Sequence, residues 1–509
     1  AVQLYQIGLS MGERDYYLAT DPSTTAIRDA FRTHVQKMYQ LAGFDEATAK
    51  KGMEVVMDVE TRLAKAFRSR TELRDPHANY NKMSMEELKK NYPTFNWDAY
   101  LSGLGLTDVK EIIVGQPASV AEAANILNTL PVDQQVLYLQ WKLIDSAASA
   151  LNDEMAQQNF DFYERTMSGT QEMQPRWKTA VSVVSSALGE AVGQMYVEKY
   201  FPAAAKERMI SLVKNLQTSL GERINNLAWM SDETKLKAQE KLATFHVKIG
   251  YPDKWRDYSN LEIKNDSYWD NIVRSNHFDY DKMIAKAGKP VDKDEWLMTP
   301  QTVNAYYNPT TNEICFPAAI LQYPFFDMNA DDACNYGAIG VVIGHEMTHG
   351  FDDQGRQYDK DGNLKDWWTS EDAKNFKERA QVLVDYFNKI EVLPGLMANG
   401  ELTLGENIAD HGGLQVAYLA LQKAMTENPL GKDENGFTPE QRFFLSYGNV
   451  WAGNIRDEQI RLQTKSDPHS LGRWRVNAAL PHISMWYDAF GVKEGDALYL
   501  PVEKRASIW

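Results

Sequence analysis

Residues 341–352 read VVIGHEMTHGFD and contain the pattern His-Glu-x-x-His. On an α-helix, residues four positions apart share a face, so His345 and His349 point the same way, one turn apart. Two imidazoles placed in this way can bind one zinc ion, and Glu346 can reach a water molecule on that metal. The apolar run at residues 336–343 predicts a buried helix that holds these side chains rigidly. The alternative is a chance match in which both histidines only form hydrogen bonds in a core.

A second stretch, GENIADHGG at residues 405–413, offers the third ligand that a catalytic zinc site requires. Glu406 is the best candidate, because it opens a predicted helix and Asp410 lies one turn later on the same face. Asp410 would accept a hydrogen bond from the far nitrogen of one ligand imidazole, and Asp352 would serve the other histidine. Alone, a Glu-x-x-x-Asp pair is typical of a solvated helix face; together with the two histidines it favours a metal site.

Such a site predicts hydrolysis by a zinc-activated water. Zinc lowers the pKa of bound water to about 7, and Glu346 can take its proton and pass it to a leaving amine. The oxyanion that develops needs donors, for which His469 and Arg475 are candidates, although His469 equally fits a surface turn. Five other histidines are assigned structural roles: His34, His77, His246, His277 and His482.

Composition limits the class of protein. With 509 residues, 43% hydrophobic, the chain is globular and long enough for two or more lobes. A net charge of -16 argues against nucleic acid as a partner. No apolar stretch is long enough to span a bilayer, and the first residues, which begin with Ala1, do not resemble a signal peptide. We therefore expect a processed or shortened form of a longer protein. Whether Cys315 and Cys334 pair stays open.

Periodicity predicts a largely helical chain with a β-hairpin just before the His-Glu-x-x-His helix. Apolar spacing predicts two helices within residues 24–65, divided at residues 42–45, and one long helix over residues 174–200. Residues 303–307 and 313–316 read as the two strands of the hairpin. An edge strand beside a metal site is well placed to pair with an extended peptide.

Five ordered motifs resemble the neprilysin family of zinc metallopeptidases, in particular its bacterial oligopeptidase branch, the endopeptidase O-like enzymes. They are VNAYY (303–307), FPAAILQ (316–322), HEMTHGFDD (345–353), GENIAD (405–410), and DPHS (467–470) followed by Arg475. The terminal Trp509 fits the family as well, and weaker similarity extends through most of the chain.

The resemblance implies a zinc-dependent endopeptidase that cuts oligopeptides on the amino side of bulky hydrophobic residues. One zinc ion per chain would be bound by His345, His349 and Glu406, with Glu346 as general base. The other roles it implies are these: Asp352 and Asp410 as supporting carboxylates, Asn304 and the Ala305 backbone on the substrate main chain, His469 on the transition state, Arg475 on a substrate carbonyl, and Ile320, Phe325, Val342, Val450 and Trp451 around an apolar pocket after the scissile bond.

The family's fold is mainly α, with two interwoven helical lobes around a central cavity and a thermolysin-like zinc catalytic lobe containing a small β-sheet. We expect residues 1–74 and 128–265 to form the capping lobe, and residues 75–127 and 266–509 the catalytic lobe. Two departures stand out. His411 replaces an Asn common in animal members, and the chain starts late, so that part of the capping lobe and an Arg near the substrate carboxylate are missing. We expect the missing segment to have been cut away, and it could remain bound as a separate fragment.

Two other classes of protein stay open at this stage. A peptide-binding or inactive relative would keep the fold, although the three ligands and Glu346 argue against it. A non-peptidase zinc hydrolase is the other, although the strand at Asn304 and Ala305 favours peptides. The family's bacterial members imply a periplasmic or cell-surface location, with the cytoplasm as the alternative.

Overall fold

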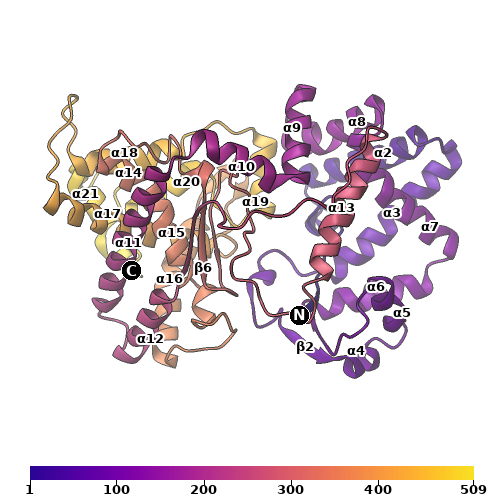
Figure 1. Cartoon of the computed structure of the whole chain (residues 1–509), viewed down its shortest axis with the longest axis horizontal. Helices are drawn as coiled ribbons and strands as arrows, with labels where there is room; N and C mark the ends of the chain where they lie inside the picture. The colour runs from indigo at the N-terminus through magenta and orange to yellow at the C-terminus, as the bar shows by residue number, and fades with distance from the viewer. The chain divides into compact units, whose positions relative to one another are not determined.

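The computed structural model describes all residues, 1–509, and divides the chain into two compact units (Figure 1). The first contains Ala1–Ala187, Asp257–Val291 and Arg456–Ser466, and the second contains Leu188–Arg256, Asp292–Ile455 and Asp467–Trp509. As expected, the fold is mainly helical with small sheets.

These units differ from the lobes expected from the sequence, because backbone pairing ties the chain together elsewhere. Residues 75–127 lie in the first unit, where strand β3 (Glu111–Val114) pairs with β1 (Val2–Leu4) and β2 (Asn81–Ser84). Residues 188–256 lie in the second unit, where strand β4 (His246–Gly250) joins the sheet beside the metal-binding motif.

The first unit is a helical assembly with one small sheet. Its helices are α1 (Asp15–Leu18), α2 (Pro22–Leu41), α3 (Glu46–Ala66), α4 (Met85–Asn91), α5 (Trp97–Gly103), α6 (Pro117–Thr129), α7 (Val132–Ala147), α8 (Asp153–Phe160), α9 (Arg176–Ala187), α13 (Tyr268–Ile284) and α19 (Asp457–Ser466). The predicted division of residues 24–65 into two helices is confirmed. Asp45 begins the second of these helices, since its side chain accepts a hydrogen bond from the Thr48 amide.

The second unit contains the sequence motifs. Its helices are α10 (Gly189–Tyr200), α11 (Ala203–Asn225), α12 (Asp232–Ala243), α14 (Asp332–Asn335), α15 (Val341–His349), α16 (Ser370–Phe387), α17 (Leu404–Glu427), α18 (Pro439–Val450), α20 (Gly472–Asn477) and α21 (Ser484–Phe490). A π-helical segment, Tyr336–Gly340, joins α14 to α15. The strands are β4, β5 (Tyr306–Asn308), β6 (Glu313–Pro317), β7 (Glu391–Leu393) and β8 (Leu396–Met397).

The long helix predicted over residues 174–200 is wrong. The chain forms α9 and α10 instead, with Leu188 outside helical geometry between them. The apolar spacing continues through this break, so periodicity alone did not reveal it. Gly189 lowers the helical preference at that point, and the break coincides with the division between the two units.

The sheet of the second unit has the order β4-β6-β5. Strand β5 pairs antiparallel with β6, Tyr306 opposite Cys315, which confirms the predicted hairpin, although the strand begins at Tyr306 and not at residue 303. Strand β4 runs parallel to β6 on its other side and was missed. A buried node joins all three strands: Lys248 and Tyr306 both bond Glu313, each at 2.9 Å. This node fixes the edge strand β5 in place.

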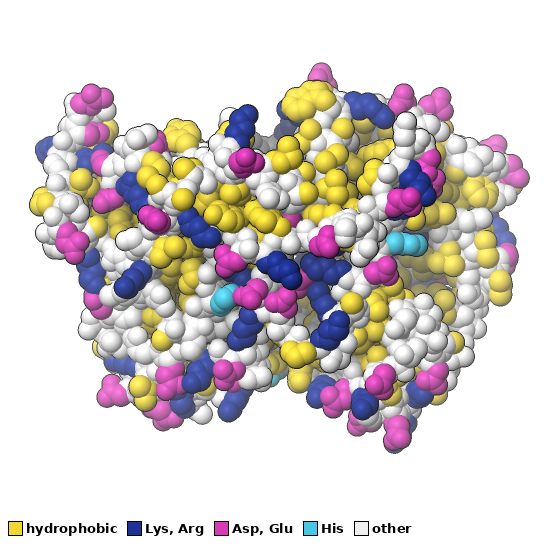
Figure 2. Space-filling view, viewed as in Figure 1, with side chains coloured by type: hydrophobic (Ala, Val, Ile, Leu, Met, Phe, Trp, Pro, Cys, Tyr) yellow, Lys and Arg dark blue, Asp and Glu magenta, His cyan; other side chains and the backbone are white.

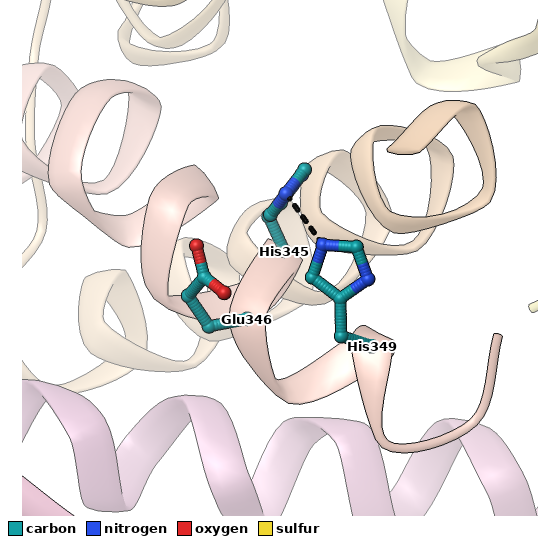
Figure 3. Close-up of side chains that lie close together, drawn as sticks. All are labelled: His345, Glu346 and His349. Carbon is teal, nitrogen blue, oxygen red and sulfur yellow. Dashed lines mark hydrogen bonds between the residues drawn. The ribbon is translucent and has the colours of Figure 1, made fainter. Parts of the chain in front are cut away.

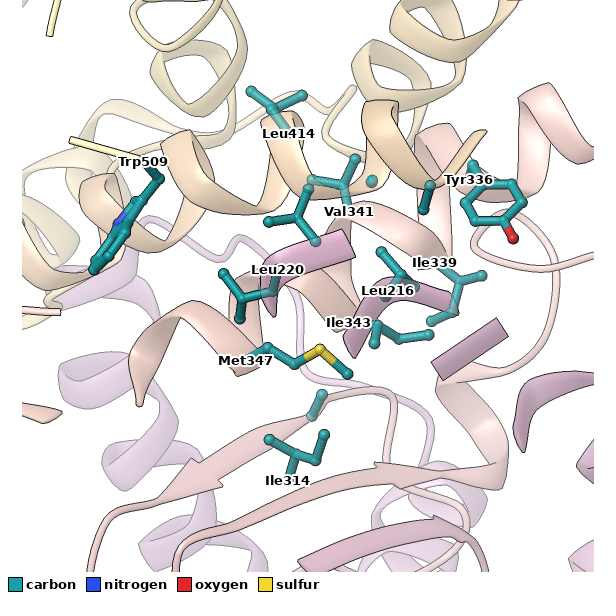
Figure 4. Close-up of a cluster of buried hydrophobic side chains, with 14 of the residues drawn as sticks. Leu216, Leu220, Ile314, Tyr336, Ile339, Val341, Ile343, Met347, Leu414 and Trp509 are labelled. Atoms are coloured by element: carbon teal, nitrogen blue, oxygen red, sulfur yellow. The ribbon is translucent and has the colours of Figure 1, made fainter. Parts of the chain in front are cut away.

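Helix α15 lies at the centre of the second unit's core. Figure 4 shows Ile343 and Met347 of α15 among side chains from α11, β6 and α17, including Leu220, Ile314 and Leu414. The indole of Trp509 packs against Phe351 and Phe376, with ring centroids 6.1 Å away in each case. The predicted burial of the His-Glu-x-x-His helix is therefore confirmed.

Cys315 and Cys334 are both free thiols. On the face drawn in Figure 2, basic side chains are interspersed with acidic ones. None of the helices is long and apolar enough to cross a membrane.

Candidate metal centre

Two helices bring the predicted ligands together. Helix α15 carries His345 and His349 on one face, and α17 carries Glu406 and Asp410 one turn apart. The helices pack closely. Figure 3 shows the two imidazoles of α15 pointing toward each other, with Glu346 on the same helix alongside them.

Three acceptor atoms converge at the centre of the site. Nε2 of His345 lies 3.0 Å from Nε2 of His349, and Oε2 of Glu406 lies 3.1 Å from the first nitrogen and 3.4 Å from the second. Oε2 of Glu406 is buried and has no hydrogen-bond partner. Zinc bonds of about 2.0–2.1 Å in a tetrahedral site hold ligand atoms roughly 3.3 Å apart. The three side chains thus fit a zinc ion.

Two carboxylates fix the orientation of the imidazoles. Nδ1 of His345 lies 2.8 Å from Oδ1 of Asp410, and Nδ1 of His349 lies 2.7 Å from Oδ2 of Asp352. When Nδ1–H donates to a carboxylate, the lone pair of Nε2 is left for a metal. Burial alone would raise the pKa of Glu406, but the two nearby imidazoles hold that pKa well below its usual range. Glu406 is therefore ionised beside the two imidazoles.

Arg475 forms a second layer behind Asp410. Its Nε and one terminal nitrogen donate to the two carboxylate oxygens of Asp410 at 2.8 and 2.6 Å. The guanidinium also stacks over the ring of Trp451, 3.8 Å from its centroid. Burial opposes the charge on Arg475, but Asp410 outweighs it and raises the pKa of the guanidinium. Arg475 is thus both a cavity-lining cation and the partner that keeps Asp410 ionised.

Glu346 and His469 both lie beside the cluster of His345, His349 and Glu406 and line the same cavity. Ligating atoms of His345, Glu346 and His349 all lie within 4.8 Å of one another. An oxygen of Glu406 lies 3.1 and 3.4 Å from the two imidazoles, so Glu406 is the candidate third ligand and Glu346 is left as the candidate base. Nε2 of His469 lies 3.3 Å from Oε2 of Glu406.

Asp467 was missed by the sequence reasoning. Its Oδ1 lies 2.7 Å from Nδ1 of His469 and also accepts from the His469 amide. The signal was present, because Asp467 stands two residues before the histidine. The pair orients His469 in the same way that Asp352 and Asp410 orient the other two imidazoles.

A cavity of about 400 Å³ opens above the cluster. It is lined by the predicted substrate-binding residues Asn304, Ala305, Arg475, Ile320, Phe325, Val342 and Trp451. Val450 was predicted to join them and does not line the cavity. It is the last residue of α18, and adjacent residues on a helix point about 100° apart, so Val450 and Trp451 do not share a direction.

Comparisons with known proteins place both parts of the chain in one family. Residues 1–252 and residues 304–506 both match Peptidase family M13, the first as its N-terminal part. Human endothelin-converting enzyme 1 is 34% identical over 526 residues, covering 100% of this chain and 67% of the enzyme. An endothelin-converting enzyme homolog of Locusta migratoria is 34% identical over 528 residues, covering 100% of this chain and 72% of that protein.

Solved structures give the same result. The zinc metalloprotease Zmp1 of Mycobacterium tuberculosis in complex with an inhibitor matches with a TM-score of 0.95 and 39% identity, over 100% of this chain and 78% of Zmp1. PepO of Lactobacillus rhamnosis matches with a TM-score of 0.89 and 27% identity, over 100% of this chain and 79% of PepO. Sequence, fold and the converging ligands together show that the chain belongs to peptidase family M13, the neprilysin family of zinc metallopeptidases, and is a metalloendopeptidase.

Proposed function

We propose that this metalloendopeptidase cuts oligopeptides on the amino side of bulky hydrophobic residues, with His345, His349 and Glu406 as the ligands of one zinc ion. One observation carries the ligand assignment: three acceptor atoms lie 3.0 to 3.4 Å apart, and the Glu406 oxygen has no donor. With both Nδ1 atoms bonded to carboxylates, the two Nε2 atoms and the Glu406 oxygen are available to bind one cation, which is the zinc ion of this proposal.

Bound zinc would supply Lewis acidity, which lowers the pKa of water and polarises a peptide carbonyl. Glu346 is the general base in this proposal: it accepts the proton of the attacking water and delivers it to the leaving amine. The Glu346 side chain is buried, and one of its oxygens lies within 4.8 Å of a ring nitrogen of each histidine, His345 and His349. Asp352 and Asp410 hold the imidazoles in the required tautomer.

His469 and Arg475 are the proposed donors to the substrate at the cavity. His469 is half-exposed at the cavity, with Nδ1 held by Asp467, so Nε2 is directed at the ligand cluster, where it donates as part of the imidazolium form. Arg475 is fixed by Asp410 and lines the same cavity. We assign His469 to the transition state and Arg475 to a substrate carbonyl, because donors held in advance stabilise charge most effectively.

Substrate binding is assigned to an edge strand and an apolar pocket. Strand β5 pairs with β6 on one side only, and Asn304 and Ala305 precede it at the cavity. An extended peptide can add to such an edge through main-chain hydrogen bonds. Four apolar side chains would receive the residue after the scissile bond: Ile320, Phe325, Val342 and Trp451. A periplasmic or cell-surface location, with the cytoplasm as alternative, stays a prediction that rests on the resemblance to the family.

The proposal is tested with Glu346→Gln, and Glu371→Gln on the exposed start of α16 serves as the matched control. A length-graded set of peptides is offered to each protein, and zinc is quantified in all three. We expect the parent and the control to cut short peptides before bulky apolar residues. Glu346→Gln should keep its zinc and lose about 10²–10⁴-fold in kcat. A Glu346→Gln variant with undiminished kcat contradicts the assignment of the base, and a parent that binds no zinc contradicts the ligand set.

A further inference from the structure

A buried lysine lies behind the metal-binding motif. Lys241, on α12, is 1% exposed. Its ammonium donates to the main-chain carbonyls of Gly350, Gly355 and Tyr358, each at 2.7 Å. All three acceptors belong to residues 350–358, which follow directly on the metal-binding helix. The three hydrogens of the ammonium thus meet three carbonyls of a single loop.

The surroundings of this ammonium are aromatic. The rings of Tyr307, Phe351 and Trp367 lie with their centroids 5.7 to 5.8 Å from Nζ. Cations are attracted to aromatic faces at this range. A lysine is costly to bury, and burial lowers the pKa of Lys241 to about 7. The three carbonyls and three rings offset part of that cost and define a single position for Nζ.

The same loop is folded around a second charge, the carboxylate of Asp352. Its Oδ1 accepts from the amides of Gln354 and Gly355 at 2.9 and 2.6 Å, while its Oδ2 meets Nδ1 of His349 at 2.7 Å. Two amides of the loop therefore point toward Asp352, and three carbonyls of the same loop point toward Lys241. Gly355 packs so closely that an added Cβ would lie 1.7 Å from the carbonyl oxygen of His349.

We propose that Lys241 is a positioning residue for the metal centre: by binding three carbonyls of residues 350–358, it holds Asp352 where it orients His349. The inference rests on the proposed role of His349 as a zinc ligand. It assigns Lys241 no contact with zinc or substrate. Lys241 would influence the metal centre only through residues 350–358 and the carboxylate of Asp352.

A purely structural role is the alternative, and helix α12 supplies the comparison. At its start, Ser231 and Thr234 donate to the carboxylate of Asp372 at 2.5 and 2.6 Å. That network ties α12 to α16 and is separate from the loop. Ser231→Ala therefore weakens the attachment of α12 without touching residues 350–358. Lys237→Met makes the lysine-to-methionine change on the exposed face of the same helix, where Lys237 pairs with Glu233.

The test compares Lys241→Met with Lys237→Met and Ser231→Ala in the full chain. Zinc loss to an excess of chelator is followed in time, and amide hydrogen exchange of residues 350–358 is measured in the metal-free protein. Losing the direct carboxylate partner of a ligand histidine weakens metal binding about 10–100-fold, so we expect the lower end for Lys241→Met, roughly tenfold faster zinc loss. Exchange in the loop should speed up, and kcat should fall with KM changed less than twofold. Both controls should keep the parent's zinc loss and loop exchange.

Several outcomes overturn the inference. Zinc loss and loop exchange in Lys241→Met equal to those of Ser231→Ala would leave Lys241 a merely structural residue. If Lys241→Met does not fold, Lys241→Gln, which keeps two donors, replaces it, and failure of both to fold also overturns the inference. A parent that binds no zinc refutes the proposed ligands first. A parent that binds zinc, beside a Lys241→Met variant that behaves like it, refutes only the role of Lys241.

Discussion

Gly344 and Gly413 meet backbone to backbone where α15 crosses α17. A Cβ added to Gly344 would lie 3.0 Å from both Cα and the carbonyl oxygen of Gly413. A Cβ on Gly413 would lie 2.7 Å from the carbonyl oxygen of Val341 and 2.8 Å from the amide nitrogen of His345. This contact without side chains lets Glu406 and Asp410 approach the imidazoles of the neighbouring helix.

Gly413→Ala should therefore separate the two helices and disturb the ligand cluster. Overpacking in a tight core costs typically about 1–3 kcal/mol, and the displacement falls next to His345. We expect a lower unfolding midpoint and faster loss of zinc to a chelator. Gly448→Ala is the control, because this helical glycine of α18 has only one atom near its added Cβ, at 4.0 Å. There the substitution should leave stability unchanged or raise it by up to about 1 kcal/mol.

Asp410 forms an ion pair with Arg475 and orients His345, so Asp410→Asn should lower both stability and zinc affinity. Breaking a buried ion pair by removing one partner costs about 3–5 kcal/mol, and losing the carboxylate behind a ligand histidine weakens zinc binding about 10–100-fold. Chemical denaturation and zinc titration measure the two effects. Asp361→Asn, at an exposed turn, should change neither. An Asp410→Asn variant with normal zinc affinity would mean that the carboxylate does not tune the ligand.

The sequence anticipated which side chains of the candidate site lie together more closely than it anticipated the two units, for a physical reason. His345, His349, Glu406 and Asp410 are fixed by local helix periodicity, which a sequence displays directly. What a sequence displays poorly is non-local pairing. Strand β4 alternates Val247 and Ile249 with polar residues, but its partner β6 is distant in the chain.

The direction in which a single side chain points also could not be predicted from the sequence. Val450 stands beside Trp451 in the chain, and only the end of α18 shows that the two point apart. No sequence pattern distinguished Lys241 from the other lysines of its helix. Its helix reads as an ordinary charged helix, and its role depends on three carbonyls contributed by a loop more than a hundred residues away.

Stability should depend on pH through His482. Its Nδ1 accepts from the Ala506 amide at 2.9 Å, and burial, with Arg505 nearby, lowers the pKa of this imidazole from 6.5 to about 4. The unfolded chain takes up a proton near pH 6.5 and the folded chain only near pH 4, so stability is lost as the pH falls through this range. The difference between the pKa values of His482 in the unfolded and folded chain corresponds to roughly 3 kcal/mol of unfolding free energy.

His482→Asn should remove that pH dependence, because the Asn oxygen can still accept from Ala506 and cannot be protonated. Unfolding midpoints of metal-free protein between pH 7.5 and 4.5 are the measurement. As the pH falls, the unfolding midpoint of the parent should decrease more than that of His482→Asn. His277→Asn on exposed helix surface is the control and should run parallel to the parent. A constant gap between parent and His482→Asn would show that His482 is not protonated on unfolding.

Substrate preference offers the sharpest test of the cavity. Val342 on α15 lines it and lies beside the proposed ligands, so Val342→Phe should fill the space meant for the residue after the scissile bond. We expect kcat/KM to fall about 10–200-fold for peptides with Phe or Leu at that position, the range associated with small changes in an apolar pocket, and least for Ala. Val450→Phe is the matched control, because Val450 is half-buried and does not line the cavity. A competition assay on one peptide series, read by mass spectrometry, compares the two variants. Equal losses for Phe, Leu and Ala in Val342→Phe would mean general damage to α15, and a changed preference in Val450→Phe would place the pocket on the other side of α18.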